Sequence, residues 1–217
     1  YRYREYVIRS FNDDKPYDRF VTEQLAGDEV DPGSRDAQIA TMFLRHWIYE
    51  FNQRDVETQW QAILNDVTET TSDVLLGMGM GCARCHDHKF DPLLQKDYYR
   101  LQAFFAPLFP RDDQAVATLE ERMAFNKQQQ AWERQTADIR RKLFEIENPV
   151  LLKHAGGQGF DKFVDEIKAM MRKRDTEREP YEQQIATLAA RQLEFDRKKL
   201  PEQINDDQKA RWEALQK

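Results

Sequence analysis

Two thiols and an imidazole stand within five residues of this chain, at Cys82, Cys85 and His86. The spacing C-x-x-C-H is the pattern at which two cysteines attach a c-type haem through its vinyl groups. In such a site the histidine that follows the second cysteine becomes the proximal iron ligand. The chain has only these two cysteines. We therefore expect Cys82, Cys85 and His86 to form the functional centre.

Other uses of the same residues stay open at this point. Cys82, Cys85, His86 and His88 carry the ligand types of a zinc site, although structural zinc sites normally take their ligands from two separated pairs. A thioredoxin-like redox pair would need a β-α-β context, and the sequence shows no strand pattern. The two cysteines could also be reduced and merely buried.

A second axial iron ligand would have to come from another methionine or histidine. The candidates are Met78, Met80, Met42, His46 and His154. Methionines at helical spacing usually fill a core, so each candidate also has a structural interpretation. His88 can either hydrogen-bond to Asp91 and the backbone or serve at an open iron position.

Composition and charge restrict the partners of the chain. Its 217 residues are 40% hydrophobic and 33% charged, with a net charge of −6. No basic cluster is long enough to neutralise a run of phosphates, so nucleic acid is not expected as a partner. No apolar run reaches the length of a membrane span. The chain opens on Tyr1 without a starting methionine, so a targeting segment could have been removed.

The first half of the sequence predicts a compact, all-α domain over residues 1–110. Apolar residues recur at helical spacing over residues 3–11, 20–25, 37–47 and 60–74. Pro16 suits the first turn of the second helix, and Gly27 its C-terminal cap. Residues 28–36 and 49–55 are predicted to be loops. After the cysteines, Asp91 and Pro92 predict the start of a helix that ends before Pro107 and Pro110.

The buried face of that last helix is predicted from its apolar residues, which are Tyr98, Leu101, Phe104 and Phe105.

Residues 111–217 predict a charged helical hairpin or small bundle, resembling a coiled coil. Apolar residues seven apart are typical of one side of a helix pair. They are Phe125, Trp132, Ile139 and Ile146. Asn148-Pro149 and residues 154–159 are expected to interrupt the first helix. Returning helices are expected near residues 163–170 and 181–195, with a break near Pro180.

Three ordered blocks of residues carry a resemblance to a known family. They are Asp14-Lys15-Pro16-Tyr17-Asp18-Arg19-Phe20 with Glu23-Gln24-Leu25-Ala26-Gly27-Asp28, then Gly81-Cys82-Ala83-Arg84-Cys85-His86-Asp87-His88-Lys89-Phe90-Asp91-Pro92, then Asp97-Tyr98-Tyr99 with Phe104-Phe105. Over roughly residues 1–110 the chain resembles the cytochrome-like domain of large planctomycete proteins, a family of unknown function. The resemblance implies an extracytoplasmic, multidomain setting in which covalent haem would be expected. The family usually has Leu-Gly-Leu-Thr where this chain has Leu76-Gly77-Met78-Gly79.

Together these patterns predict an all-α domain that binds haem c through Cys82, Cys85 and His86 and transfers electrons. The expected partners are other domains of a longer, periplasmic or cell-surface protein and a redox partner. An electron-transfer or binding domain is expected rather than an enzyme by itself. The alternative is a zinc-type metal-binding or structural interaction module. Haem attachment does not require the charged and polar residues that follow the C-x-x-C-H motif, which are Asp87, His88, Lys89 and Asp91. Their presence leaves a hydrolytic or metal-assisted role open.

Overall fold

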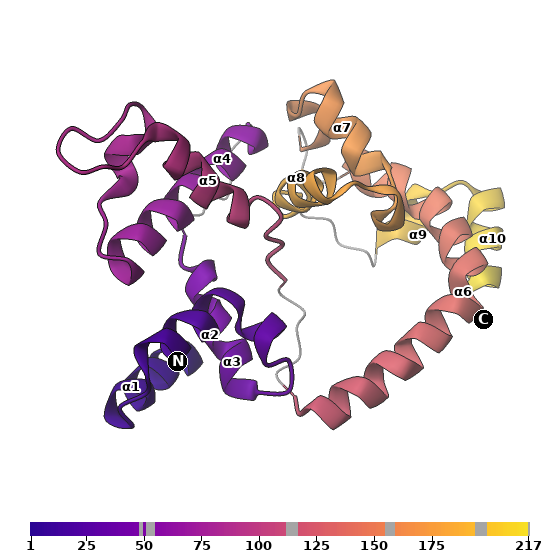
Figure 1. Ribbon diagram of the computed structural model, residues 1–217. Coiled ribbons are helices and arrows are strands. Elements are labelled where there is room, and N and C mark those ends of the chain that lie inside the picture. Colours follow the sequence, from indigo (N-terminus) through magenta and orange to yellow (C-terminus); the bar gives the residue numbers. More distant parts are fainter. Residues whose placement is uncertain (48–49, 51–54, 112–116, 155–158, 194–198, 217) are drawn as a thin grey trace. The chain divides into compact units, whose positions relative to one another are not determined.

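The computed structural model describes residues 1–47, 50, 55–111, 117–154, 159–193 and 199–216, and these are helical or irregular, with no strand (Figure 1). The predicted all-α class is therefore confirmed. The predicted loop at 49–55 lies almost wholly outside the described residues, as does most of the predicted break at 154–159. Among the described residues, no helix combines the length and apolar character that crossing a membrane requires.

The first half of the chain contains short and medium helices. They are α1 (Arg2–Asn12), α2 (Tyr17–Val30), α3 (Arg35–Ala40), the 3-10 helix η1 (Thr41–Arg45), α4 (Val56–Thr70), the π-helical turn η2 (Thr71–Leu75), the 3-10 helix η3 (Met80–Arg84) and α5 (Gln95–Phe105). The second half begins with the long helix α6 (Leu119–His154). It continues with η4 (Phe160–Lys162), α7 (Asp165–Arg172), η5 (Asp175–Glu177), α8 (Pro180–Ala190), α9 (Leu200–Gln203) and α10 (Asp206–Leu215). The predicted hairpin or small bundle thus consists of one long helix followed by short ones.

The chain forms two compact units, and each is built from two separate stretches of sequence. The first unit contains Tyr1–Ile48 and Ala62–Gln129, and the second contains Tyr49–Gln61 and Gln130–Lys217. The boundary predicted near residue 110 separates segments that are expected to fold independently. The two compact units are defined by contacts and do not test independent folding, so this boundary stays a prediction.

The amphipathic pattern of α1 builds the N-terminal core of the first unit. Tyr6 of α1 is buried with Ile39 and Ala40 of α3. The helix α2 closes on α3 at Gly27, where an added Cβ would come within 2.3 Å of the Ala37 carbonyl oxygen. The backbone is non-helical at Ala26 (φ −149°, ψ 26°), and α2 continues after this kink to Val30, so Gly27 follows a kink inside the helix and does not cap its end as predicted. Glycine is needed there for the close approach of two backbones.

Three predicted helix boundaries differ from the structure. The segment predicted as one helix over 37–47 divides into α3 and the 3-10 helix η1. The helix predicted to start at Asp91-Pro92 starts at Gln95, with Asp97 accepting a hydrogen bond from the Leu94 backbone N–H at 3.1 Å. Pro149 does not interrupt α6, which runs through it to His154. A proline removes one backbone hydrogen bond, and the rest of this long helix tolerates that loss.

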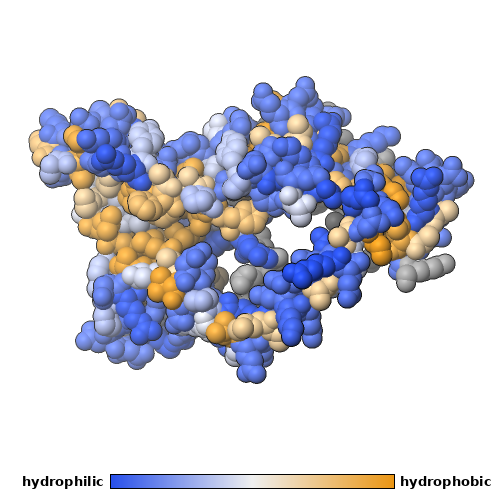
Figure 2. All heavy atoms as spheres, turned by 45° about the vertical axis from the view of Figure 1, so that its right-hand side comes forward, coloured by the Kyte–Doolittle hydropathy of each residue, from blue (hydrophilic) through white to orange (hydrophobic). Residues whose placement is uncertain are grey.

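Polar and charged residues cover most of one face of the molecule (Figure 2). Figure 2 shows a mostly hydrophilic face on which apolar residues gather in patches. Three of the heptad residues of α6, Phe125, Trp132 and Ile139, are exposed in the described structure. Further along α6, the Trp212 indole N–H of α10 donates to Glu147 Oε1 at 2.8 Å. In the second unit α10 therefore contacts the C-terminal part of this long helix.

Candidate functional site

The chain enters the cysteine motif through an unusual helix end. The helix α4 widens into the π-helical turn η2, a form that is frequent at functional sites. Gly77 then adopts a left-handed conformation with φ of 63°, and the Met78 N–H donates to the Ser72 carbonyl at 2.9 Å. This geometry ends the helix, and the chain turns into an open loop before α5 (Figure 1).

The 3-10 helix η3 places the two thiols on its outer side. A 3-10 helix repeats every three residues, so residues three apart lie one above the other. Met80 and Ala83 are three apart and are buried with Tyr98 of α5. Cys82 and Cys85 are also three apart, and both are free and exposed. The C-x-x-C spacing thus presents both thiols on one side, away from the core.

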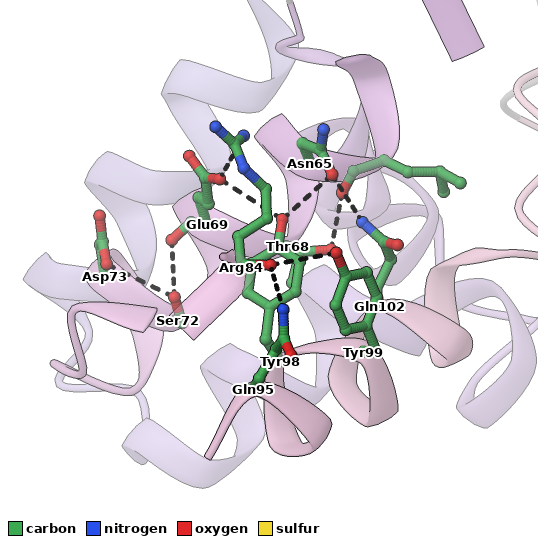
Figure 3. Close-up of polar contacts among 11 residues, drawn as sticks. Asn65, Thr68, Glu69, Ser72, Asp73, Arg84, Gln95, Tyr98, Tyr99 and Gln102 are labelled. Atoms are coloured by element: carbon green, nitrogen blue, oxygen red, sulfur yellow. Dashed lines mark hydrogen bonds and ion pairs between the residues drawn. The ribbon is translucent and has the colours of Figure 1, made fainter. Parts of the chain in front are cut away.

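Arg84 ties the turn between the cysteines to both neighbouring helices. Its guanidinium forms an ion pair with Glu69 of α4, with Nη1 and Oε1 2.9 Å apart. Its carbonyl accepts hydrogen bonds from Gln95 Nε2 and from the Tyr99 hydroxyl of α5, each at 3.1 Å. Figure 3 shows the side chain pointing to Glu69 while Gln95 and Tyr99 approach the backbone.

A partly buried polar network joins α4 to α5 beside these contacts. The Tyr98 hydroxyl donates to Asn65 Oδ1 at 3.2 Å and lies 3.4 Å from Glu69 Oε1. Gln102 Nε2 donates to the same Asn65 oxygen at 2.8 Å (Figure 3). Burial, together with the nearby Glu69 carboxylate, raises the pKa of Tyr98 to about 12. The hydroxyl therefore stays protonated as a donor.

Sequence patterns missed this network. The predicted apolar face of α5 included Phe104, which is 79% exposed, whereas Gln102 is buried. The missed signal is a pair of polar residues four apart on each helix, Asn65 and Glu69 on α4 and Tyr98 and Gln102 on α5. Residues four apart share a helix face.

A backbone carbonyl sets the tautomer of the His86 ring. Its ring is exposed, and its Nδ1 lies 2.7 Å from the Asp87 carbonyl oxygen. Because a carbonyl oxygen can only accept, Nδ1 carries the proton and Nε2 keeps a free lone pair. Metal-binding histidines commonly donate their second nitrogen to such a carbonyl, which fixes the ring and the tautomer.

His88, two residues further on, takes the opposite tautomer. Its half-buried ring accepts at Nδ1 from the Asp91 backbone N–H at 2.9 Å, with the Phe90 N–H at 3.4 Å. In the neutral ring the proton is then on Nε2. Asp91 Oδ2 lies 3.2 Å from the same nitrogen. His88 and Asp91 therefore close a turn, and Asp91 does not cap a helix as predicted.

The structure separates the other candidate ligands from one another. Met80 is buried beneath the cysteines, while Met78 is partly exposed beside them. Met42 and His46 belong to η1 and its end, where the His46 ring packs 4.7 Å from that of Tyr3. His46 therefore lies beside the α1–α3 core, and Met42 is exposed on η1. His154 ends α6, and its side chain lies outside the description.

In the part of the chain that the structure describes, three or more His, Cys, Asp or Glu side chains do not gather in a metal-binding group.

Apolar side chains remain exposed around the cysteine loop. Leu76 and Met78 precede η3, and Leu94 precedes α5. Phe90, at the tip of the loop, is 84% exposed. Large contiguous patches of such side chains mark binding surfaces, whereas single exposed apolar side chains are common on proteins.

Comparison with known proteins places the chain in a family but gives no characterised relative. Among curated proteins nothing matches, and the same is true of solved structures. One family model, described as PSCyt2, a protein of unknown function (DUF1549), matches residues 1–109. The matched region is half of the chain and includes the whole loop from Cys82 to Pro92. The chain belongs to this DUF1549 family.

Proposed function

We propose that the first half of the chain is a c-type haem-binding electron-transfer domain. Cys82 and Cys85 supply the two thiols for covalent attachment, and His86 Nε2 is the proximal iron ligand. The observation that carries the proposal is the His86 hydrogen bond to Asp87, which leaves Nε2 free directly after two exposed thiols.

The residues present fit such a group. Both thiols are free and face outward, so they can reach the edge of a planar ring. Exposed apolar side chains such as Leu76 and Phe90 could cover the faces of that ring. When bound, haem would supply one-electron oxidation and reduction. The protein holds the proximal imidazole in one tautomer and keeps the attachment turn fixed on α4 and α5.

The zinc alternative has weaker support from the hydrogen bonds. A four-ligand site would need His88 in addition to Cys82, Cys85 and His86. The Nδ1 lone pair of His88 is already used by the Asp91 N–H, and its Nε2 carries the proton. Only three of the four ligands are therefore ready for coordination.

The second axial position has several candidates under this proposal. Met78 lies close in sequence and is partly exposed, and Met42 and His46 come from η1. The burial of Met80 disfavours it, because its sulfur would have to leave the core. The domain would serve a redox partner within a longer, extracytoplasmic protein.

The test is covalent haem retention by the full chain produced with a haem-c maturation system. The alkaline pyridine haemochrome spectrum and metal analysis are measured after acid–acetone extraction. We expect stoichiometric iron and a haem spectrum in the wild type, and loss of both in a Cys82→Ser/Cys85→Ser variant. The matched control His88→Ala should retain haem. Stoichiometric zinc without haem, or neither, would overturn the proposal.

A further inference from the structure

The peptide group between Arg84 and Cys85 is held by two donors from one helix. The Arg84 carbonyl accepts from Gln95 Nε2 and from the Tyr99 hydroxyl, each at 3.1 Å. These donors are four residues apart on α5 and so lie on the same face. With two donors, both lone pairs of the carbonyl oxygen are used.

A fixed carbonyl fixes the cysteine that follows it. The peptide group is planar, so the orientation of the Arg84 C=O also sets the positions of the Cys85 nitrogen and Cα. The Cys82 end of the turn is held separately, because Met80 and Ala83 are buried against Tyr98. The hydrogen bonds to Arg84 thus act on Cys85 and on its position relative to Cys82.

The helix that supplies both donors is itself anchored. The Gln95 backbone N–H donates to Asp87 Oδ1 at 2.8 Å, which ties the start of α5 to the residue after His86. Below it, Tyr98 and Gln102 both donate to Asn65 of α4. Figure 3 shows Gln95 and Tyr99 converging on Arg84 from this supported helix.

We propose that Gln95 and Tyr99 are positioning residues that set the spacing of the Cys82 and Cys85 thiols. Both side chains are exposed, so burial does not require their hydrogen bonds to Arg84. A role in placing Cys85 accounts for two donors on one surface carbonyl.

For haem attachment, which rests on the proposed function, this spacing decides whether both thioethers form. Each thiol adds across one vinyl group, so that an S–C bond forms and the thiol hydrogen moves to the neighbouring carbon. No electron is gained or lost overall. A ring joined at one cysteine can complete the second bond only if the other thiol lies opposite the second vinyl.

The first experiment uses the haem-loaded full chain. Tyr99→Phe, Gln95→Ala and their double variant are compared with wild type by alkylation of unreacted thiols and mass spectrometry. The double variant should contain about tenfold more singly attached protein, at the low end of the 10–100-fold effects seen when groups that orient metal ligands are mutated. Its pyridine haemochrome α-band should move to longer wavelength. Phe104→Ala, which changes an exposed side chain of the same helix outside the contacts described above, should resemble wild type.

The second experiment uses the haem-free full chain and separates this inference from the proposed function. The Cys82–Cys85 pair is equilibrated with glutathione buffers, and the fraction of disulfide gives its midpoint potential. The double variant should shift this midpoint, and Phe104→Ala should not. A wild type without haem would overturn the proposed function while this titration still decides the positioning role. An unchanged midpoint in the double variant overturns the positioning role.

Discussion

Two histidines two residues apart are prepared for different tasks by their backbone partners. His86 donates from Nδ1 to a carbonyl, whereas His88 accepts at Nδ1 from a backbone N–H. The sequence motif shows both as ligand candidates, because composition and spacing do not reveal a tautomer. Only the local chain path determines which imidazole has a free Nε2.

At the residue scale, the two histidines should differ in their contribution to stability. His88→Ala removes the acceptor for the Asp91 N–H and should lower the free energy of unfolding by about 1 kcal/mol. His86→Ala removes an exposed ring and should change it by less than about 0.5 kcal/mol. Urea denaturation of the haem-free protein measures both. Equal effects of the two substitutions would contradict the assignment of His88 to the turn.

A second residue-scale feature is the buried carboxylate of Glu23. It accepts from the Tyr6 hydroxyl at 2.8 Å and from Arg19 Nε at 2.7 Å, and it pairs with Lys15. Burial alone would raise the pKa of Glu23, but the hydrogen bonds from Lys15, Arg19 and Tyr6 outweigh it, so the pKa is lowered. This network joins the loop after α1 to α2.

The lowered pKa predicts a loss of stability in acid. The folded-state pKa of Glu23 lies below its ordinary value of 4.5, so its contribution is complete above that pH and is lost as pH falls through the folded-state pKa. Glu23→Gln should cost roughly 2 kcal/mol near neutral pH, because the Lys15 charge loses its partner. It should also flatten the pH dependence in the acid range. Urea unfolding over a pH series tests this, and parallel curves for both proteins would refute it.

At the scale of elements, Gly77 controls how α4 ends before the cysteines. Its φ of 63° strains other residues, and nothing lies within 4 Å of an added Cβ. Gly77→Ala should therefore cost about 1 kcal/mol through the backbone alone. Gly79 provides the matched control, since it has open space and a φ of −70°. Gly79→Ala should be nearly neutral in thermal unfolding, and equal losses at both positions would contradict this explanation.

Helices with a regular apolar period could be predicted from the sequence, and their ends could not. Trp60, Ile63, Leu64 and Val67 repeat on one face of α4, and all four are buried. The predicted start of α5 differs from the structure because an Asp side chain suits both the N-cap position, predicted for Asp91, and the third helical position, where Asp97 lies. The His88 turn uses Asp91, and so the Asp97 side chain serves the helix. Such a choice depends on a hydrogen bond that spacing alone does not show.

The sequence predicts which residues carry the chemistry of the candidate site, but it does not predict which residues of other helices hold them in place. The C-x-x-C-H spacing identified Cys82, Cys85 and His86 as one group. Glu69 comes from a helix fifteen residues before Arg84, and their ion pair depends on how α4 packs beside η3. Tertiary contacts of this kind leave no local pattern.

At the scale of the whole molecule, the family match and the compact units divide the chain differently. The match ends at residue 109, whereas the second compact unit includes Tyr49–Gln61 from within the matched region. Val56 and Trp60 lie in that stretch, and both are buried in the complete chain. Their burial should therefore depend on residues 130–217.

A fragment of residues 1–110 should then expose Trp60 to solvent. With Trp47→Phe in the fragment, its fluorescence reports Trp60 alone, and the emission should move to longer wavelength than that of Trp60 in the full chain. The matching full-chain reference carries Trp47→Phe, Trp132→Phe and Trp212→Phe. The fragment should also bind more of a dye that senses exposed apolar surface, since burial of such surface drives folding. Unchanged emission together with cooperative unfolding would instead show that residues 1–110 bury Trp60 themselves. In that case the boundary near residue 110 would mark an independently folding domain, and the contact with the C-terminal stretch would add little to its stability.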